Sequence, residues 1–231
     1  MGRTSGIRGG LYAVSEWIAK FSLNNLQWAV FNLPIALLVI SMIYAEKVED
    51  IYYLTPTLVV LMPILFFPAT TALFAKAREW VRKDLDDRPE RSYISYYKEN
   101  YKVSVQAGIV FTILWGILLG DIYYFSTVNE LIMNVFFIVG IILYVFTVNF
   151  FSVTVHFDLK ARPAFKKAFL VTIVSPLSFV TVAITSAIML YISVYVFPLM
   201  IPIFTGSIIA FLSFSSFYRL FLKLNHKEKN G

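Results

Sequence analysis

Long apolar segments alternate with short polar ones along the whole chain. The apolar stretches lie at about 24–45, 54–77, 104–125, 131–157, 168–192 and 196–218. Each exceeds the roughly 18 residues expected of a membrane-spanning helix, and none shows the two-residue alternation of a barrel strand. The pattern therefore predicts an all-α polytopic membrane protein, with about six transmembrane helices and short loops in a single membrane domain, residues 1–231.

Two amphipathic segments outside these spans are expected at the membrane surface. In the first, within residues 1–23, apolar side chains from Leu11 to Phe21 share one helical face, as in a helix that lies in the headgroup plane. In the second, residues 92–102, several tyrosines fall near one side, and tyrosine is enriched at membrane boundaries. Ordinary interfacial anchoring explains both segments, and docking of a partner is the alternative.

Composition supports a membrane location. Apolar residues make up 58% of the chain and charged residues 15%, and the mean hydropathy is +0.72, whereas soluble domains are nearer half apolar and a quarter charged. The net charge of +6 follows membrane topology, so we expect the lipid bilayer and not nucleic acid as the partner. The chain has no cysteine, which excludes disulfides and thiolate ligands.

The distribution of lysine and arginine predicts the orientation. Basic residues gather in the N-terminal segment, the connection 78–103, the segment 160–167 and the tail 219–231, whereas Lys47 stands among acidic residues between the first two spans. Short basic loops are retained in the cytoplasm. We therefore expect a multi-pass protein of the cell membrane with both termini cytoplasmic, and a basic cytoplasmic connection at 78–103.

Few residues offer chemistry at membrane depth. Ionisable residues are almost absent from the interior of the spans, and His156 and His226 do not form an H-E-x-x-H zinc motif,. We expect no catalytic residue, no cofactor and no metal site. Gly116 and Gly120 form a G-x-x-x-G pair, which is a candidate for close helix packing.

The second span contains the run P-A-T-T-A, which then turns basic. Pro68 removes a backbone donor, and Ala69 to Ala72 reduce the side-chain bulk, so we expect a bend with a narrow waist that packs against a neighbouring helix. Beyond it, Arg78 and Trp80 place the helix at the cytoplasmic interface. A structural hinge is the simplest interpretation of this run.

Several motifs resemble the YesL-like integral membrane family of bacteria, a domain of unknown function. They are N-N-L-x-W before the first span, P-A-T-T-A-L-F with its basic continuation, and F-D-L ahead of A-F-K-K-A-F. The resemblance implies a small cytoplasmic-membrane protein associated with carbohydrate uptake systems of the ABC type, and it brings no catalytic or ligand residue. Together, the motif and packing candidates are Asn25, Leu26, Trp28, Pro68, Ala69, Thr70, Thr71, Ala72, Leu73, Arg78, Trp80, Phe157 and Asp158.

Three functional hypotheses follow. The first is a non-enzymatic accessory or assembly subunit that contacts the permease or ATPase subunits of a carbohydrate ABC transporter, with the mixed charges around Asp84, Asp86 and Asp87 as a docking surface. The second is an autonomous transporter or channel for a neutral solute, which requires a continuous water-accessible cavity. The third, an intramembrane enzyme, is disfavoured because no pair of titratable groups shares one depth.

Overall fold

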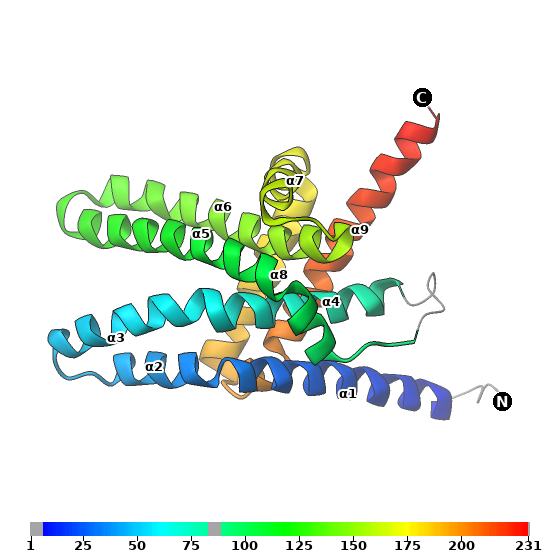
Figure 1. The fold of residues 1–231 in the computed structure, drawn as a ribbon, viewed down its shortest axis with the longest axis horizontal. Helices are drawn as coiled ribbons and strands as arrows, with labels where there is room; N and C mark the ends of the chain where they lie inside the picture. Colours follow the sequence, from blue (N-terminus) through cyan, green and yellow to red (C-terminus); the bar gives the residue numbers. More distant parts are fainter. Residues whose placement is uncertain (1–6, 83–88, 231) are drawn as a thin grey trace.

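The computed structural model describes residues 7–82 and 89–230, and all regular structure within these ranges is helical (Figure 1). The aspartates of the expected docking surface, at 84, 86 and 87, lie outside the described residues. The elements are α1 (Ile7–Phe31), α2 (Leu33–Ile43), α3 (Val48–Leu61), the π-helix η1 (Met62–Phe66), α4 (Phe67–Arg82), α5 (Tyr93–Val128), α6 (Glu130–Phe157), α7 (Ala161–Val174), α8 (Pro176–Tyr191), the π-helices η2 (Ile192–Val196) and η3 (Ile201–Thr205), and α9 (Gly206–Asn230).

The helices have the lengths of membrane spans. Within the described ranges, five helical stretches are long and apolar enough to cross a membrane, and there are six if the bent pair α1–α2 counts as one span. The second span, Val48–Arg82, runs through α3, η1 and α4 without a break. The predicted all-α, multi-pass architecture is therefore confirmed.

The first predicted span, 24–45, is neither straight nor separate from the segment before it. Helix α1 begins at Ile7, so much of the expected surface segment is continuous with the apolar helix. At Asn32 the direction changes by 68°, where Pro34 lies in the first turn of α2 and cannot donate a backbone hydrogen bond. The Asn32 side-chain amide donates to the Trp28 carbonyl at 2.7 Å and covers the end of α1.

The fifth predicted span, 168–192, is wrong in its first part. Helix α7 ends at Val174, and the apolar stretch from Pro176 to Val196 is the span. Ser175 separates the two helices, and its hydroxyl accepts a hydrogen bond from the Ser178 amide at 3.3 Å. A serine cap followed by proline is a strong helix start, and it overrides the continuous apolar pattern.

Two helical hairpins extend to one side of the molecule (Figure 1). The turns α2–α3 and α5–α6 lie at that side, which we call the hairpin end, whereas α1 begins and α4 and α9 end at the opposite side. We call the latter the basic end, because α4 carries Lys76, Arg78 and Arg82 in its last turns. The acidic residues Glu49 and Asp50 at the start of α3 and the basic residues at the end of α4 are thus at opposite sides of the fold.

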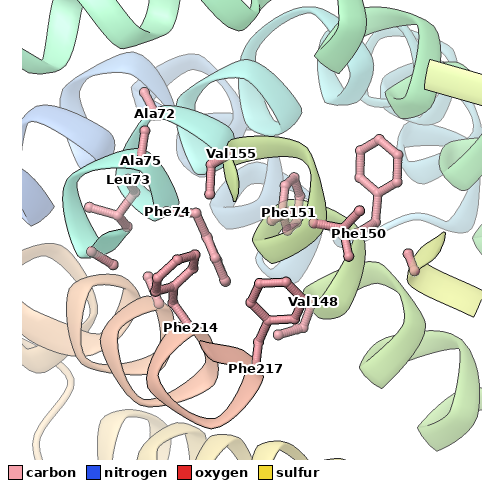
Figure 2. Close-up of a cluster of buried hydrophobic side chains, with 14 of the residues drawn as sticks. Ala72, Leu73, Phe74, Ala75, Val148, Phe150, Phe151, Val155, Phe214 and Phe217 are labelled. Carbon is pink, nitrogen blue, oxygen red and sulfur yellow. The ribbon is translucent and has the colours of Figure 1, made fainter. Parts of the chain in front are cut away.

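The buried core surrounds α4 rather than the hairpin turns. Figure 2 shows Leu73, Phe74 and Ala75 of α4 packed with phenylalanines and valines of α6 and with Phe214 and Phe217 of α9. In the most apolar 18-residue part of the Val48–Arg82 span, 50% of the stretch is buried. In the corresponding part of α6, 17% is buried. The second span is therefore the central helix of the molecule.

The close helix contact involves a different glycine from the predicted pair. Gly116 and Gly120 have no neighbouring atom within 4 Å of a Cβ built on them, so the G-x-x-x-G pair does not pack against another helix of the described chain. A Cβ on Gly108 would instead lie 2.7 Å from the Pro63 Cα. Gly108 therefore permits α5 to approach the π-helix η1.

Candidate functional site

The second span changes its hydrogen bonding immediately before the P-A-T-T-A run. In η1, the Phe67 amide donates to the Met62 carbonyl, five residues earlier. Pro68 has no N–H to donate to the Ile64 carbonyl, and the Tyr97 hydroxyl donates to that oxygen at 3.4 Å. The π-helical turn thus accommodates the proline, and such turns are frequent at functional sites.

The two threonines of the run join α4 to two other helices. The Trp28 indole of α1 donates to the Thr70 hydroxyl at 3.1 Å, and the Ser104 hydroxyl of α5 donates to the Thr71 hydroxyl at 2.8 Å. Thr71 in turn donates to the Phe67 carbonyl at 2.9 Å. The hydroxyl groups therefore provide interhelical hydrogen bonds, as membrane helices commonly use them.

The small residues of the run lie in contact with neighbouring helices. Ala69 and Ala72 are completely buried, and Pro68 is also buried. The Tyr93 hydroxyl, at the start of α5, donates to the Ala69 carbonyl at 2.7 Å. Because alanine leaves room for this close approach, the run forms a packed waist between α1, α4 and α5.

Asn25, the second asparagine of N-N-L-x-W, joins the N-terminal and C-terminal parts of the chain. Its amide nitrogen donates to the Ile201 carbonyl at 2.8 Å, and its oxygen accepts from the Ser207 amide at 2.8 Å. A Cβ on Gly206 would lie 2.9 Å from that oxygen. Asn25 is fully buried and satisfies backbone groups where η3 passes into α9, a role that hydrophobic residues cannot take.

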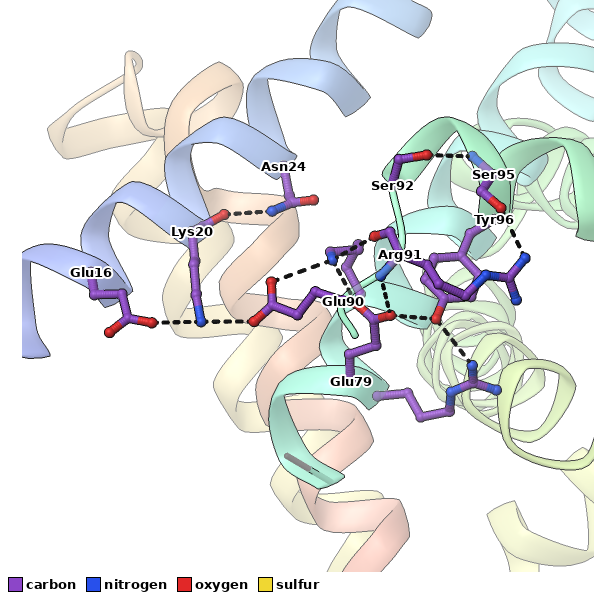
Figure 3. A network of polar contacts seen from close by, with 11 residues as sticks. Glu16, Lys20, Asn24, Glu79, Glu90, Arg91, Ser92, Ser95 and Tyr96 are labelled. Carbon is purple, nitrogen blue, oxygen red and sulfur yellow. Dashed lines mark hydrogen bonds and ion pairs between the residues drawn. The ribbon is translucent and has the colours of Figure 1, made fainter. Parts of the chain in front are cut away.

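Glu79, Glu90 and Arg91 belong to a polar network at the basic end (Figure 3), and a buried lysine, Lys76, contacts all three. Lys76 is 5% exposed, and its ammonium pairs with Glu79 at 2.5 Å and donates to the Arg91 carbonyl at 2.9 Å. Glu90 lies 3.8 Å from Lys76 and 2.9 Å from Lys20 of α1. The network thus connects α4, the segment before α5, and α1.

Glu79 is the carboxylate that completes this network. Its second oxygen accepts from the Tyr96 hydroxyl at 2.5 Å and from the Arg91 amide at 2.9 Å. The Arg91 guanidinium lies 4.8 Å from the centre of the Tyr96 ring and pairs with Glu99 at 2.9 Å. A buried ion pair is favourable only when its remaining hydrogen bonds are satisfied, and Glu79 fulfils that condition.

Arg78 points to a different place from Lys76. Its guanidinium donates to the Val155 carbonyl near the C-terminus of α6, and it contacts the Tyr96 hydroxyl at 3.5 Å. A cation at this position complements the free carbonyls and the negative pole of a helix end. Among residues 7–82 and 89–230, no carboxylate lies within ion-pair distance of Arg78. Asp158 lies three positions after Val155 and directly follows the last residue of α6. It ends that helix in a left-handed conformation with φ of 48°.

A small polar cavity lies beside Arg78. Its volume is about 180 Å³. The polar residues of its lining are Arg78, Arg91, Tyr96, Glu99, Asn100, Thr154 and Asp158, and Ala75 and Val155 complete it. The cavity therefore has charged and hydrogen-bonding groups from three segments of the chain.

A larger cavity, of about 470 Å³, lies between the helices near the waist. Its walls are mainly aromatic and aliphatic side chains, including Phe66, Phe151 and Trp115. The Trp115 indole, like that of Trp28, is directed to a threonine hydroxyl, here Thr147 at 3.4 Å. This cavity offers an apolar surface and few groups that could hydrate a polar solute.

The structure distributes the predicted motif residues among several places. Trp28 and residues 68–72 form the waist, Asn25 joins α1 to the start of α9, and Arg78 and Asp158 line the polar cavity. Trp80 packs edge-on against Phe21 of α1, with ring centres 5.1 Å apart. Phe157 packs against Phe221 of α9 and beneath the Lys167 ammonium, 3.6 Å from the ring centre.

Sequence reasoning missed several residues of the basic end. Tyr93 and Tyr96 were expected at the membrane boundary, but they are 2% and 3% exposed and donate to α4. Glu79 and Thr154 also went unrecognised. The spacing of Lys76 and Glu79, one helical turn apart, is the signal that could have indicated an ion pair; Thr154 has no comparable signal.

Similarity to known proteins covers the waist motifs. Residues 21–122 match the family described as "Protein of unknown function, DUF624". The uncharacterized protein YteU of Bacillus subtilis (strain 168) is 24% identical over 229 residues, 98% of this chain and 90% of YteU. The uncharacterized protein YesL of the same organism is 22% identical over 171 residues, 74% of this chain and 70% of YesL. No solved structure is significantly similar to the chain. These similarities confirm the resemblance that the motifs indicated.

Proposed function

We propose that this YesL-like membrane protein is a non-enzymatic accessory or assembly subunit that binds the permease of a carbohydrate ABC-type uptake system in the bacterial cytoplasmic membrane. The link to carbohydrate uptake rests on the family resemblance. The geometry supports the other part of the proposal, a partner within the membrane. In this proposal the basic end faces the cytoplasm.

The observation that carries the proposal is the exposure of the two hairpins. Helix α3 buries none of its side chains, and α2 buries Ile35 alone. On α6, Val135 and Ile138 are 51% and 60% exposed. Helix association in a membrane depends on packing rather than on removal of apolar surface from water, so the exposed faces of the hairpins are available to the helices of another protein.

The rival function, transport of a neutral solute by this chain alone, receives less support. A polar solute needs hydrogen-bonding groups along its path to replace water. The walls of the cavity near the waist are mainly aromatic and aliphatic, with Thr70, Thr147 and Thr205 among the few polar groups. The indoles of Trp28 and Trp115 already donate to Thr70 and Thr147. An accessory role requires no such path.

Crosslinking from the hairpins tests the proposal. The chain has no cysteine, so Val59→Cys in α3 and Ile138→Cys in α6 each introduce a unique attachment point for a thiol-linked photocrosslinker. In membranes of the native host, we expect a product with an identified ABC permease subunit from at least one of these sites. Leu177→Cys, on the exposed start of α8 (78% exposed), is the matched control and should give no such product. If neither hairpin site captures a permease, or if Leu177→Cys captures it equally, the proposed role is wrong.

A further inference from the structure

The polar cavity at the basic end contains a cation whose bonding capacity is not exhausted by the protein. Arg78 uses its guanidinium to donate to Val155 and to contact Tyr96, whereas a guanidinium carries five N–H donors in a rigid fork. In the described part of the chain, no carboxylate pairs with it. Arg78 also lines the cavity, so its unused donors have a space in which a ligand could accept them.

A second group in the same cavity lacks any partner. Thr154 is 1% exposed, and its hydroxyl oxygen has no hydrogen-bond partner among the described residues. Buried hydroxyls are normally paired, because an unpaired one loses its hydration without compensation. Thr154 lines the cavity with Arg78, so a ligand in the cavity is the candidate partner for its hydroxyl.

The acidic groups around the cavity do not neutralise Arg78. Glu99 pairs with Arg91 at 2.9 Å, and Glu79 is occupied by Lys76 and Tyr96. Asp158 also lines the cavity but is exposed to solvent, where its charge is screened. Arg78 therefore favours a ligand with a negative group, and Glu99, Asn100 and Asp158 of the same lining can accept hydrogen bonds from that ligand,.

We propose that this cavity binds the phosphate group of a phosphate ester, with Arg78 donating to the phosphate oxygens and the Thr154 hydroxyl donating a further hydrogen bond. Arginine suits phosphate because its planar fork matches two oxygens at once. The volume of about 180 Å³ suits a small headgroup. The ester is either a soluble molecule or the headgroup of an anionic lipid, because both present the same chemistry. This site goes beyond the accessory role and does not depend on it.

Thermal unfolding of the purified full-length protein separates the two sources. One arm adds inorganic phosphate or glycerol phosphate to protein in a neutral detergent, with chloride at matched ionic strength as the reference. The other compares nanodiscs of phosphatidylcholine with nanodiscs that also contain phosphatidylglycerol. A ligand that binds only the folded state raises the unfolding temperature in a saturable manner. Saturation in the first arm identifies a soluble ester, and an effect confined to the second identifies a lipid headgroup.

Two variants of cavity residues, each with a matched control, connect the rise in unfolding temperature to the cavity. Thr154→Val removes the unpaired hydroxyl at nearly constant shape, and it should weaken the apparent affinity about 2- to 10-fold, the usual range for one neutral hydrogen bond. Arg78→Gln should weaken it about 10- to 100-fold. The controls are Thr112→Val, which removes another unpaired buried hydroxyl outside the cavity, and Arg162→Gln, which removes an exposed charge on α7.

The outcomes are decisive in either direction. We expect saturable stabilisation of the parent protein in one arm, a weaker apparent affinity in Thr154→Val and Arg78→Gln, and an unchanged affinity in both controls. Should Arg78→Gln fail to fold, Thr154→Val alone decides. The proposal is overturned if neither arm stabilises the parent beyond chloride, or if Thr154→Val responds like the parent.

Discussion

Gly108 shows how a single residue controls the approach of two helices. A Cβ on this residue would lie 2.7 Å from the Pro63 Cα and 3.0 Å from the Phe67 ring. The first of these atoms belongs to the backbone of η1, so rotation of a side chain cannot relieve the contact. Gly116, two turns further along the same helix, has open space around it. The two glycines therefore provide a matched pair within α5.

Replacement of each glycine by alanine is expected to have opposite effects. Alanine favours a helix by about 1 kcal/mol over glycine, so Gly116→Ala should leave the stability unchanged or raise it slightly. Gly108→Ala adds a clash that forces α5 away from η1, and overpacking of this kind typically costs about 1–3 kcal/mol. The apparent unfolding temperature in detergent provides the measurement. Equal unfolding temperatures for the two variants would show that the α5–η1 contact is not close.

The same residues show what a sequence motif can and cannot predict. The G-x-x-x-G spacing correctly identifies two glycines on one helical face, but it says nothing about what lies opposite that face. Gly108 has no partner glycine at this spacing, and its importance depends on the tertiary position of Pro63. Thr154 is similar, because its unpaired hydroxyl results from the packing of α4, α5 and α6 around it.

At the scale of elements, an ion pair within the basic continuation of α4 is hydrogen-bonded to α5 and to the segment before it. Lys76 and Glu79 have side chains that are 6% and 15% exposed, and Glu79 also accepts from Tyr96 and from the Arg91 amide. Removal of one member of a buried pair leaves an unpaired charge, which typically costs about 3–5 kcal/mol. A single substitution of Lys76 or Glu79 should thus lower the stability of the α4–α5 junction strongly. Substitution of both residues together should lower it less than the two single effects combined.

A double-mutant cycle on Lys76 and Glu79 measures this sensitivity. We expect Glu79→Gln to lower the unfolding temperature more than Lys76→Met, because Glu79 has several donors and Lys76→Met leaves two of them in place. The double variant should be less destabilised than the sum of the two, with a coupling of about 0.5–3 kcal/mol. Glu99→Gln, which breaks an exposed pair with Arg91, should cost under about 1 kcal/mol. Additive effects would mean that Lys76 and Glu79 do not interact energetically in the folded protein.

The elements themselves were largely predictable from apolar length, and the failures occur at prolines. Counting apolar residues merged the end of α7 with α8, and it did not show the 68° bend within the first span. Ser175 with Pro176, and Asn32 with Pro34, interrupt these stretches without interrupting their hydrophobicity. The tyrosines at the start of α5 are a second example. Composition alone cannot distinguish a tyrosine at the membrane boundary from Tyr93, whose hydroxyl donates to the Ala69 carbonyl.

At the scale of the whole molecule, the burial of apolar side chains and the density of basic side chains both change along the long axis. The aromatic core lies around α4 and the first turns of α9 (Figure 2), whereas the hairpin end exposes most of its apolar side chains. Basic residues gather at the opposite end, with the ion-pair network (Figure 3). The molecule therefore combines a charged end with two apolar hairpins that suit contacts inside the bilayer.

Cysteine labelling tests how this axis is oriented in the membrane. The α2–α3 turn and the start of α3 carry Glu46, Glu49 and Asp50, whereas Lys160 lies at the opposite side, in the connection between α6 and α7. Since short basic segments are retained in the cytoplasm, we expect Asp50→Cys to react with a membrane-impermeant maleimide in intact cells. Lys160→Cys should react only after permeabilisation, and the cysteine-free parent is the blank. Labelling of Lys160→Cys in intact cells, with protection of Asp50→Cys, would reverse the orientation and would place the phosphate site proposed at Arg78 on the outer surface.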